Sequence, residues 1–146
     1  MPCFSLPAHG RGAENGFPGK HAAKCKCQKE RRKMVRKTVR REMKDVRGGH
    51  GTVIFEDVIT KDEFNGHGSL YARVTLPAGS SIGYHQHIDN TEQYFVLSGH
   101  GIFIDTDGSR VPVGPGDVCY IEVGQSHGME NPSDQDMVMM ALIYNK

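Results

Sequence analysis

From residue 51 onward, short β-rich runs alternate with turns, and this pattern limits the possible folds more than any other feature of the chain. The turns are rich in Gly, Pro, Asn and Asp, and no helical periodicity separates the runs. The expected strands cover residues 52–59, 69–76, 82–87, 93–97, 101–105, 110–113, 118–121 and 137–144. Eight short strands at this spacing predict an all-β domain, built as a small antiparallel sandwich or barrel.

The distribution of charge divides the chain at the same place. Residues 1–50 contain 14 Lys and Arg against 4 Asp and Glu, whereas residues 51–146 contain 4 against 13. The two segments therefore differ physically, although the net charge of the whole chain is only +1. An acidic body repels nucleic acid, so nucleic-acid binding is not expected of it.

Residues 1–33 are expected to form a disordered basic tail, because their Gly, Pro, Ala and Lys residues show no periodicity. Cys25 and Cys27 form a C-x-C pair there, but a structural zinc site needs a second ligand pair, so a metal site in the tail is not expected. Met34 offers an internal start, in which case residues 1–33 would not belong to the functional protein. Without a secretory signal or a run of 18 apolar residues, a cytoplasmic protein without membrane attachment is expected.

Residues 34–50 are expected to form a basic helix or arm. Val35, Val39, Met43 and Val46 follow one another at spacings of four, four and three, and Gly48-Gly49 would end the helix. Three roles are open, namely packing on the acidic body or a partner subunit, lying on a membrane surface, and binding nucleic acid. The stripe lacks Trp, Phe and Leu, which argues against the membrane and leaves packing as the preferred role.

Three histidines and a glutamate in the barrel segment form a candidate metal centre. His85 and His87 are two residues apart in an extended run, so both imidazoles should point to one face. Glu92 follows across a turn, and His127 opens a later segment. Three imidazoles and one carboxylate suit manganese, iron, nickel, copper, cobalt or zinc better than calcium or magnesium.

The same residues fall within two motifs that resemble those of the cupin superfamily. Gly79, His85, His87, Glu92 and Gly99 match the first cupin motif at every position. The run from Gly116 to Asn131, which includes His127, matches the second motif except that Glu122 replaces a proline. The resemblance implies a jelly-roll barrel over residues 51–146 that binds one metal through His85, His87, Glu92 and His127. Asn131 is expected to support a turn.

The resemblance narrows the chemistry without choosing one reaction, because this fold supports many. The chain is similar to small manganese cupins described as oxalate-decarboxylase-like, which implies a divalent transition metal, manganese or iron before nickel or zinc. Larger decarboxylases carry an arginine three positions before the first ligand histidine, where this chain has Ile82. We therefore expect an enzyme acting on a small carboxylate or oxygen-rich metabolite, by decarboxylation or dioxygenation. A sugar or sugar-phosphate isomerase and a non-catalytic sensor remain alternatives.

Strand parity suggests three residues that contact the ligand. Tyr94 should face the same side as Glu92, and Met129 the same side as His127. Arg73 is one of only four basic residues in the acidic body and would pair with a substrate carboxylate or phosphate if it points inward. A homodimer is also expected, because residues 52–59 could be exchanged as an edge strand and cupins usually dimerise.

Overall fold

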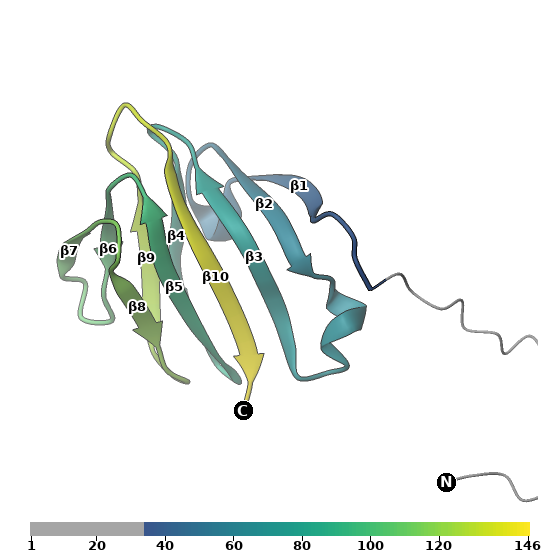
Figure 1. Ribbon diagram of the computed structural model, residues 1–146. Helices are drawn as coiled ribbons and strands as arrows, with labels where there is room; N and C mark the ends of the chain where they lie inside the picture. Colours follow the sequence, from purple (N-terminus) through teal and green to yellow (C-terminus); the bar gives the residue numbers. More distant parts are fainter. Residues whose placement is uncertain (1–33) are drawn as a thin grey trace, which may run out of the picture. The chain divides into compact units, whose positions relative to one another are not determined.

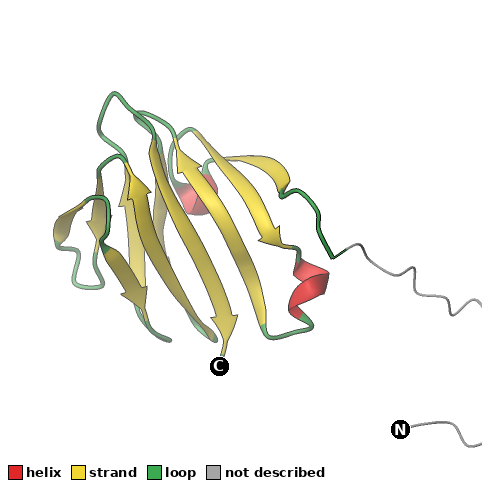
Figure 2. Cartoon of the chain, in the orientation of Figure 1, coloured by secondary structure: helices red, strands yellow, loops and turns green. Residues whose placement is uncertain are grey.

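The computed structural model describes residues 34–146, which form an almost entirely β structure (Figures 1 and 2). The elements in chain order are β1 (Val39–Lys44), the 3-10 turn η1 (Val46–Gly48), β2 (Thr52–Ile59), the 3-10 turn η2 (Lys61–Phe64), β3 (Gly68–Leu76), β4 (Ser81–Gln86), β5 (Asn90–Ser98), β6 (Gly101–Ile104), β7 (Arg110–Val113), β8 (Val118–Ile121), β9 (Ser126–Glu130) and β10 (Met137–Asn145). All eight strands expected from the sequence are present, which confirms the all-β class.

The strands form two antiparallel sheets that enclose the hydrophobic core. The larger sheet has the order β1-β2-β3-β10-β5-β8, and the smaller has the order β4-β9-β6-β7. Figure 1 shows the two sheets as separate layers. Along β3 the side chains of Leu70, Ala72 and Val74 point into the core while those between them face outward. Residues of both sheets, such as Met139 of β10 and Phe103 of β6, belong to one buried cluster.

The helix expected over residues 34–50 is wrong. Val39–Lys44 instead forms β1, which pairs antiparallel with β2. Arg41 pairs with Asp57 across the two strands at 2.8 Å, and its guanidinium lies 4.1 Å from the centre of the Phe55 ring. The basic segment therefore does pack on the acidic body. It is a strand because it pairs with β2, and the spacing of apolar residues within the segment gives no information about that pairing.

A ninth barrel strand, β9, was missed by the sequence analysis. Its sequence Ser126–Glu130 contains a central glycine and no β-branched residue, so its propensity for a strand is weak. It forms because β4 and β6 pair with its two edges. Pairing with the two neighbouring strands thus stabilises an extended conformation that the local sequence favours only weakly.

The expected edge role of residues 52–59 is also wrong, since β2 lies between β1 and β3. The edges of the larger sheet are β1 and β8. The homodimer itself stays a prediction, as do the domain boundaries at residues 33/34 and 50/51. The tail, with Cys25 and Cys27, lies outside the described residues.

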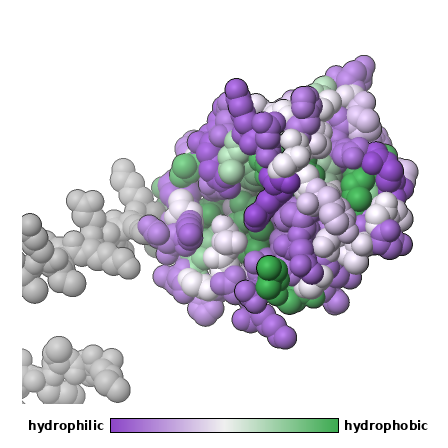
Figure 3. Space-filling model, turned by 180° about the vertical axis from the view of Figure 1, so that it is seen from behind, coloured by the Kyte–Doolittle hydropathy of each residue, from purple (hydrophilic) through white to green (hydrophobic). Residues whose placement is uncertain are grey.

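The surface seen in Figure 3 is largely hydrophilic, with apolar areas that include a hollow near the middle of the view. Within residues 34–146, no helix is long and apolar enough to cross a membrane.

Candidate metal centre

Three neighbouring segments bring the four predicted ligands together inside the barrel. His85 lies on β4 and His87 directly after it, Glu92 lies on β5, and His127 lies on β9. His85 and His127 are direct partners in the antiparallel pair of β4 and β9. Since opposed residues in such a pair point to the same face, the pairing places both imidazoles over the barrel interior.

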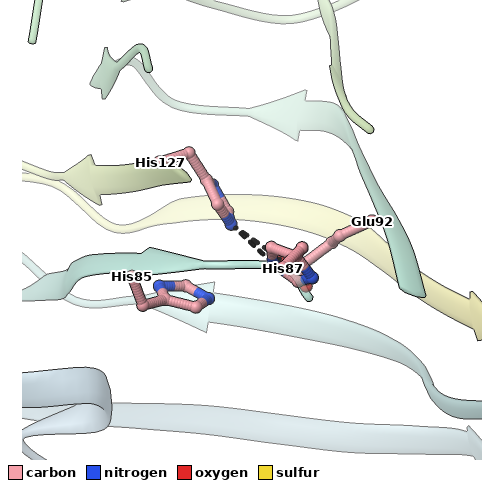
Figure 4. A group of neighbouring side chains, drawn as sticks. All are labelled: His85, His87, Glu92 and His127. Carbon is pink, nitrogen blue, oxygen red and sulfur yellow. Dashed lines mark hydrogen bonds and ion pairs between the residues drawn. The ribbon is translucent and has the colours of Figure 1, made fainter. Parts of the chain in front are cut away.

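The donor atoms of the four side chains converge on one point, as Figure 4 shows. One ligand atom from each residue lies within 4.8 Å of all the others. The Oε2 atom of Glu92 is 2.9 Å from Nε2 of His127 and 3.1 Å from Nε2 of His87. The two Nε2 atoms are 3.0 Å apart. The sequence therefore predicted the correct four residues to be neighbours.

Two of the histidines are held in the orientation that a metal ligand needs. Nδ1 of His85 lies 2.9 Å from the carbonyl oxygen of Gly83, and Nδ1 of His87 lies 2.5 Å from Oδ1 of Asn90. Because both oxygens accept, each Nδ1 carries the proton and donates it. Each Nε2 is then directed at the other ligands, the arrangement by which outer contacts orient metal-binding imidazoles. Asn90 was not singled out by the sequence analysis.

The residues present fit a bound cation. Nδ1 of His127 is buried without a hydrogen-bond partner in the described part of the chain, and Oε2 of Glu92 is buried beside the Nε2 atoms of His87 and His127. Burial by itself would raise the pKa of Glu92, but His127 and His87 outweigh it and lower this pKa to about 2, so the carboxylate is charged. Burial lowers the pKa of His85 and thereby favours its neutral form. A charged carboxylate together with three imidazoles is a donor set for a borderline divalent metal ion.

A cavity of about 440 Å³ opens beside this group. His85, Glu92 and Tyr94 contribute its polar inner wall, and aliphatic side chains from β3, β4 and β10 contribute much of the rest. Arg41 and Arg47 also line it, and both come from the segment before the barrel. The volume admits a small molecule, and the two arginines favour a negatively charged one.

The three residues predicted to contact a bound small molecule lie in different places. Tyr94 is buried, lines the cavity and lies with its ring 5.4 Å from that of His127. Burial and the charge of Glu92 raise the pKa of Tyr94 well above its ordinary value, so its hydroxyl stays protonated and can donate a hydrogen bond. Met129 is fully buried in the core and does not line the cavity.

Arg73 does not reach the cavity. It lies on the outer face of β3 and forms an ion pair of 2.6 Å with Glu56 of β2. Arg73 was a candidate ligand contact only if it pointed inward, and that condition is not met, because position 73 alternates with the core residues on either side of it. The cations that do line the cavity, Arg41 and Arg47, were missed because their segment was expected to be helical.

Comparisons with known proteins agree with this geometry. The family described as Cupin domain matches residues 72–143. The Oxalate-binding protein of Thermotoga maritima is 39% identical over 99 residues, which is 68% of this chain and 81% of that protein. The chain belongs to the cupin superfamily. A crystal structure from Thermotoga maritima, described as a predicted oxalate decarboxylase, matches with a TM-score of 0.70 and 36% identity over 75% of this chain and 94% of the other. A Cupin 2 conserved barrel domain protein from Salinispora arenicola matches with a TM-score of 0.55 and 25% identity, covering 64% of this chain and 76% of that one.

The turns of this cupin explain why its motifs contain glycine. Gly79, Gly99 and Gly116 have φ values of 73°, 77° and 95°, which side chains rarely adopt. Asn131 is buried and donates from Nδ2 to the carbonyl oxygens of Leu76 and Gln135. It supports a turn, as expected.

Proposed function

We propose that this cupin binds one divalent transition metal ion through His85, His87, Glu92 and His127, and that a small dicarboxylate of the oxalate class binds at that metal. The observation that carries the proposal is the convergence of four donor atoms beside a small cavity with cationic side chains at its wall. The similarity to a protein described as oxalate-binding supports the choice of ligand class.

The charges of the site favour an anionic ligand. A divalent ion with three neutral imidazoles and one carboxylate carries a net charge of about +1, so a dianion is attracted to it. When bound, the metal supplies an electrophilic centre with coordination positions that the four side chains leave open. The chain adds a hydrogen-bond donor in Tyr94 and apolar walls that limit the access of water.

Turnover of that dicarboxylate, by decarboxylation or oxidation, is a second candidate. Its support is the similar structure described as a predicted oxalate decarboxylase. The cavity wall, as far as the structure describes it, contains one carboxylate, Glu92, which belongs to the metal-binding group. His85 also belongs to that group and Tyr94 keeps its proton, so the described wall offers no general base for neutral pH outside the metal-binding group. Binding is therefore the function that the geometry supports best.

Titration calorimetry with oxalate tests the proposal directly. Protein purified without added metal is analysed for its metal content, then loaded with Mn²⁺ and titrated. We expect one metal and one oxalate per chain, and loss of both in His127→Ala. The control variant Arg73→Gln, on the outer face, should retain both. Failure of the loaded protein to bind oxalate would contradict the proposal, and release of formate or CO₂ from oxalate would establish the second candidate.

A further inference from the structure

The loop from Asp45 to Gly51, at the wall of the cavity, is held in place by backbone hydrogen bonds. Its own backbone bonds close it, with Gly48 N donating to Asp45 O at 3.0 Å and Asp45 N donating to Gly51 O at 2.9 Å. It is tied to β4 by Ser81, whose N donates to His50 O at 2.8 Å and whose Oγ accepts from His50 N at 2.8 Å. The loop is therefore held against the strand that carries His85.

Two glycines allow the backbones of the loop and β4 to touch. A Cβ at Gly49 would overlap the carbonyl oxygen of Ser81, and a Cβ at Gly83 would overlap that of Arg47. Both contacts are with backbone atoms, which cannot move aside as a flexible side chain can. The close approach thus sets Arg47 against β4, beside Ile82 and His85 of the cavity wall.

Arg47 adopts a conformation that arginine normally avoids. Its φ of 55° and ψ of 30° lie in the left-handed region, as do the φ of 49° and ψ of 46° of Asp45. Such residues cost free energy and persist where the surrounding structure imposes them, often at ligand sites. Here the imposed conformation accompanies a side chain that lines the cavity.

The two arginines of the cavity wall differ in the interactions that their guanidinium groups already form. The guanidinium of Arg41 binds Asp57 through two nitrogen atoms and lies over the Phe55 ring. Arg47 forms no ion pair with any residue in the described range 34–146. Its guanidinium keeps its full capacity to bind a carboxylate through two parallel hydrogen bonds.

We propose that Arg47 determines the specificity of the cavity for dianions, by binding the oxygens of a small dicarboxylate that face away from the metal centre. This inference rests on the proposed function. It assigns the positively charged contact of the bound dicarboxylate to the loop of residues 45–51. The ligand class is a compact dicarboxylate. A monocarboxylate of similar size has only one charge to share between the metal and Arg47, so it benefits less.

Binding by Mn²⁺-loaded full chain, measured by calorimetry with oxalate and with glycolate, tests the inference. Arg47→Gln should weaken oxalate binding at least about tenfold, because a hydrogen bond to a charged group is lost. Glycolate binding should change by no more than about threefold. The matched control is Arg40→Gln, which removes an exposed arginine of β1 that pairs with Glu42 and does not line the cavity. It should bind both ligands as the wild type does.

A second variant separates ligand binding from folding. Arg47→Asn places a residue that tolerates the left-handed region at this position, so its melting temperature should equal or exceed that of the wild type. Its metal content should be unchanged while oxalate binding falls as in Arg47→Gln. Oxalate binding within twofold of the wild type in both variants would overturn the inference, as would an equal loss in Arg40→Gln. If the wild type itself binds no oxalate, the proposed function fails and the inference falls with it.

Discussion

At the scale of single residues, the centre depends on side chains that hold the ligands as well as on the ligands themselves. Asn90 accepts a hydrogen bond from Nδ1 of His87 and so directs Nε2 at Glu92 and His127. The spacing of the motif indicates His87 but not its acceptor, because Asn90 directly follows a bend, at the start of β5, where Asn is common for other reasons.

Asn90→Ala is expected to weaken metal binding about 10–100-fold, since the imidazole of His87 loses the contact that orients it. Competition with a chelator of known affinity measures the change. Asn145→Ala is the matched control, because that side chain donates to Gly66 O and forms no hydrogen bond with a candidate metal ligand in the described residues. Equal metal affinity in Asn90→Ala and the wild type would mean that the cavity alone orients His87.

At the scale of elements, β1 and η1 change what the cavity can bind. The barrel supplies the four candidate metal ligands, while the segment before it supplies Arg41 and Arg47. β1 is an edge strand, and its Arg41 pairs with Asp57 of β2, whereas its Arg40 pairs with Glu42 of β1 itself. Such exposed or half-exposed pairs stabilise a fold weakly. The position of the loop of residues 45–51 therefore depends mainly on its contact with β4.

Gly83→Ala is expected to destabilise the fold by about 1–3 kcal/mol, because the new methyl group meets the backbone of the loop at Arg47 and Gly49. Hydrogen exchange should increase over residues 45–51, and oxalate binding should weaken. Gly114→Ala is the control, since its Cβ meets only the side chain of His100, which can turn away. Unchanged exchange in the loop of Gly83→Ala would show that the close approach does not hold it.

At the scale of the whole molecule, the proposed metal binding would be linked to folding, because the four candidate ligands, from three parts of the chain, come together only in the folded barrel. A metal present at 100 times its dissociation constant stabilises the folded state by about 2.7 kcal/mol. The hydrogen bond to Glu92 raises the pKa of His87 above its ordinary value, so the metal competes with a proton there.

The stabilisation by metal should therefore increase with pH. In metal-free protein, the raised pKa of His87 contributes stability that is fully present below about pH 6.5 and is lost as the pH rises through the folded pKa. Metal binding needs the neutral imidazole and strengthens over the same range. Melting curves with and without Mn²⁺ at pH 6 and pH 8 should show the larger difference at pH 8. A His87→Ala variant should show no such dependence, and a constant difference in the wild type would contradict this linkage.

The sequence by itself determined the β class, eight of the barrel strands and the four neighbouring residues of the candidate metal centre. These are local signals, since alternation, turns and motif spacing lie within short stretches of chain. The tertiary structure determined the conformation of residues 39–44 and 126–130, which form strands because they pair with neighbouring strands of the sheets. It also placed Arg73 outside the cavity and Arg47 at its wall. Which cation reaches a cavity depends on contacts between segments far apart in the sequence, and such contacts leave no periodic signal in either segment.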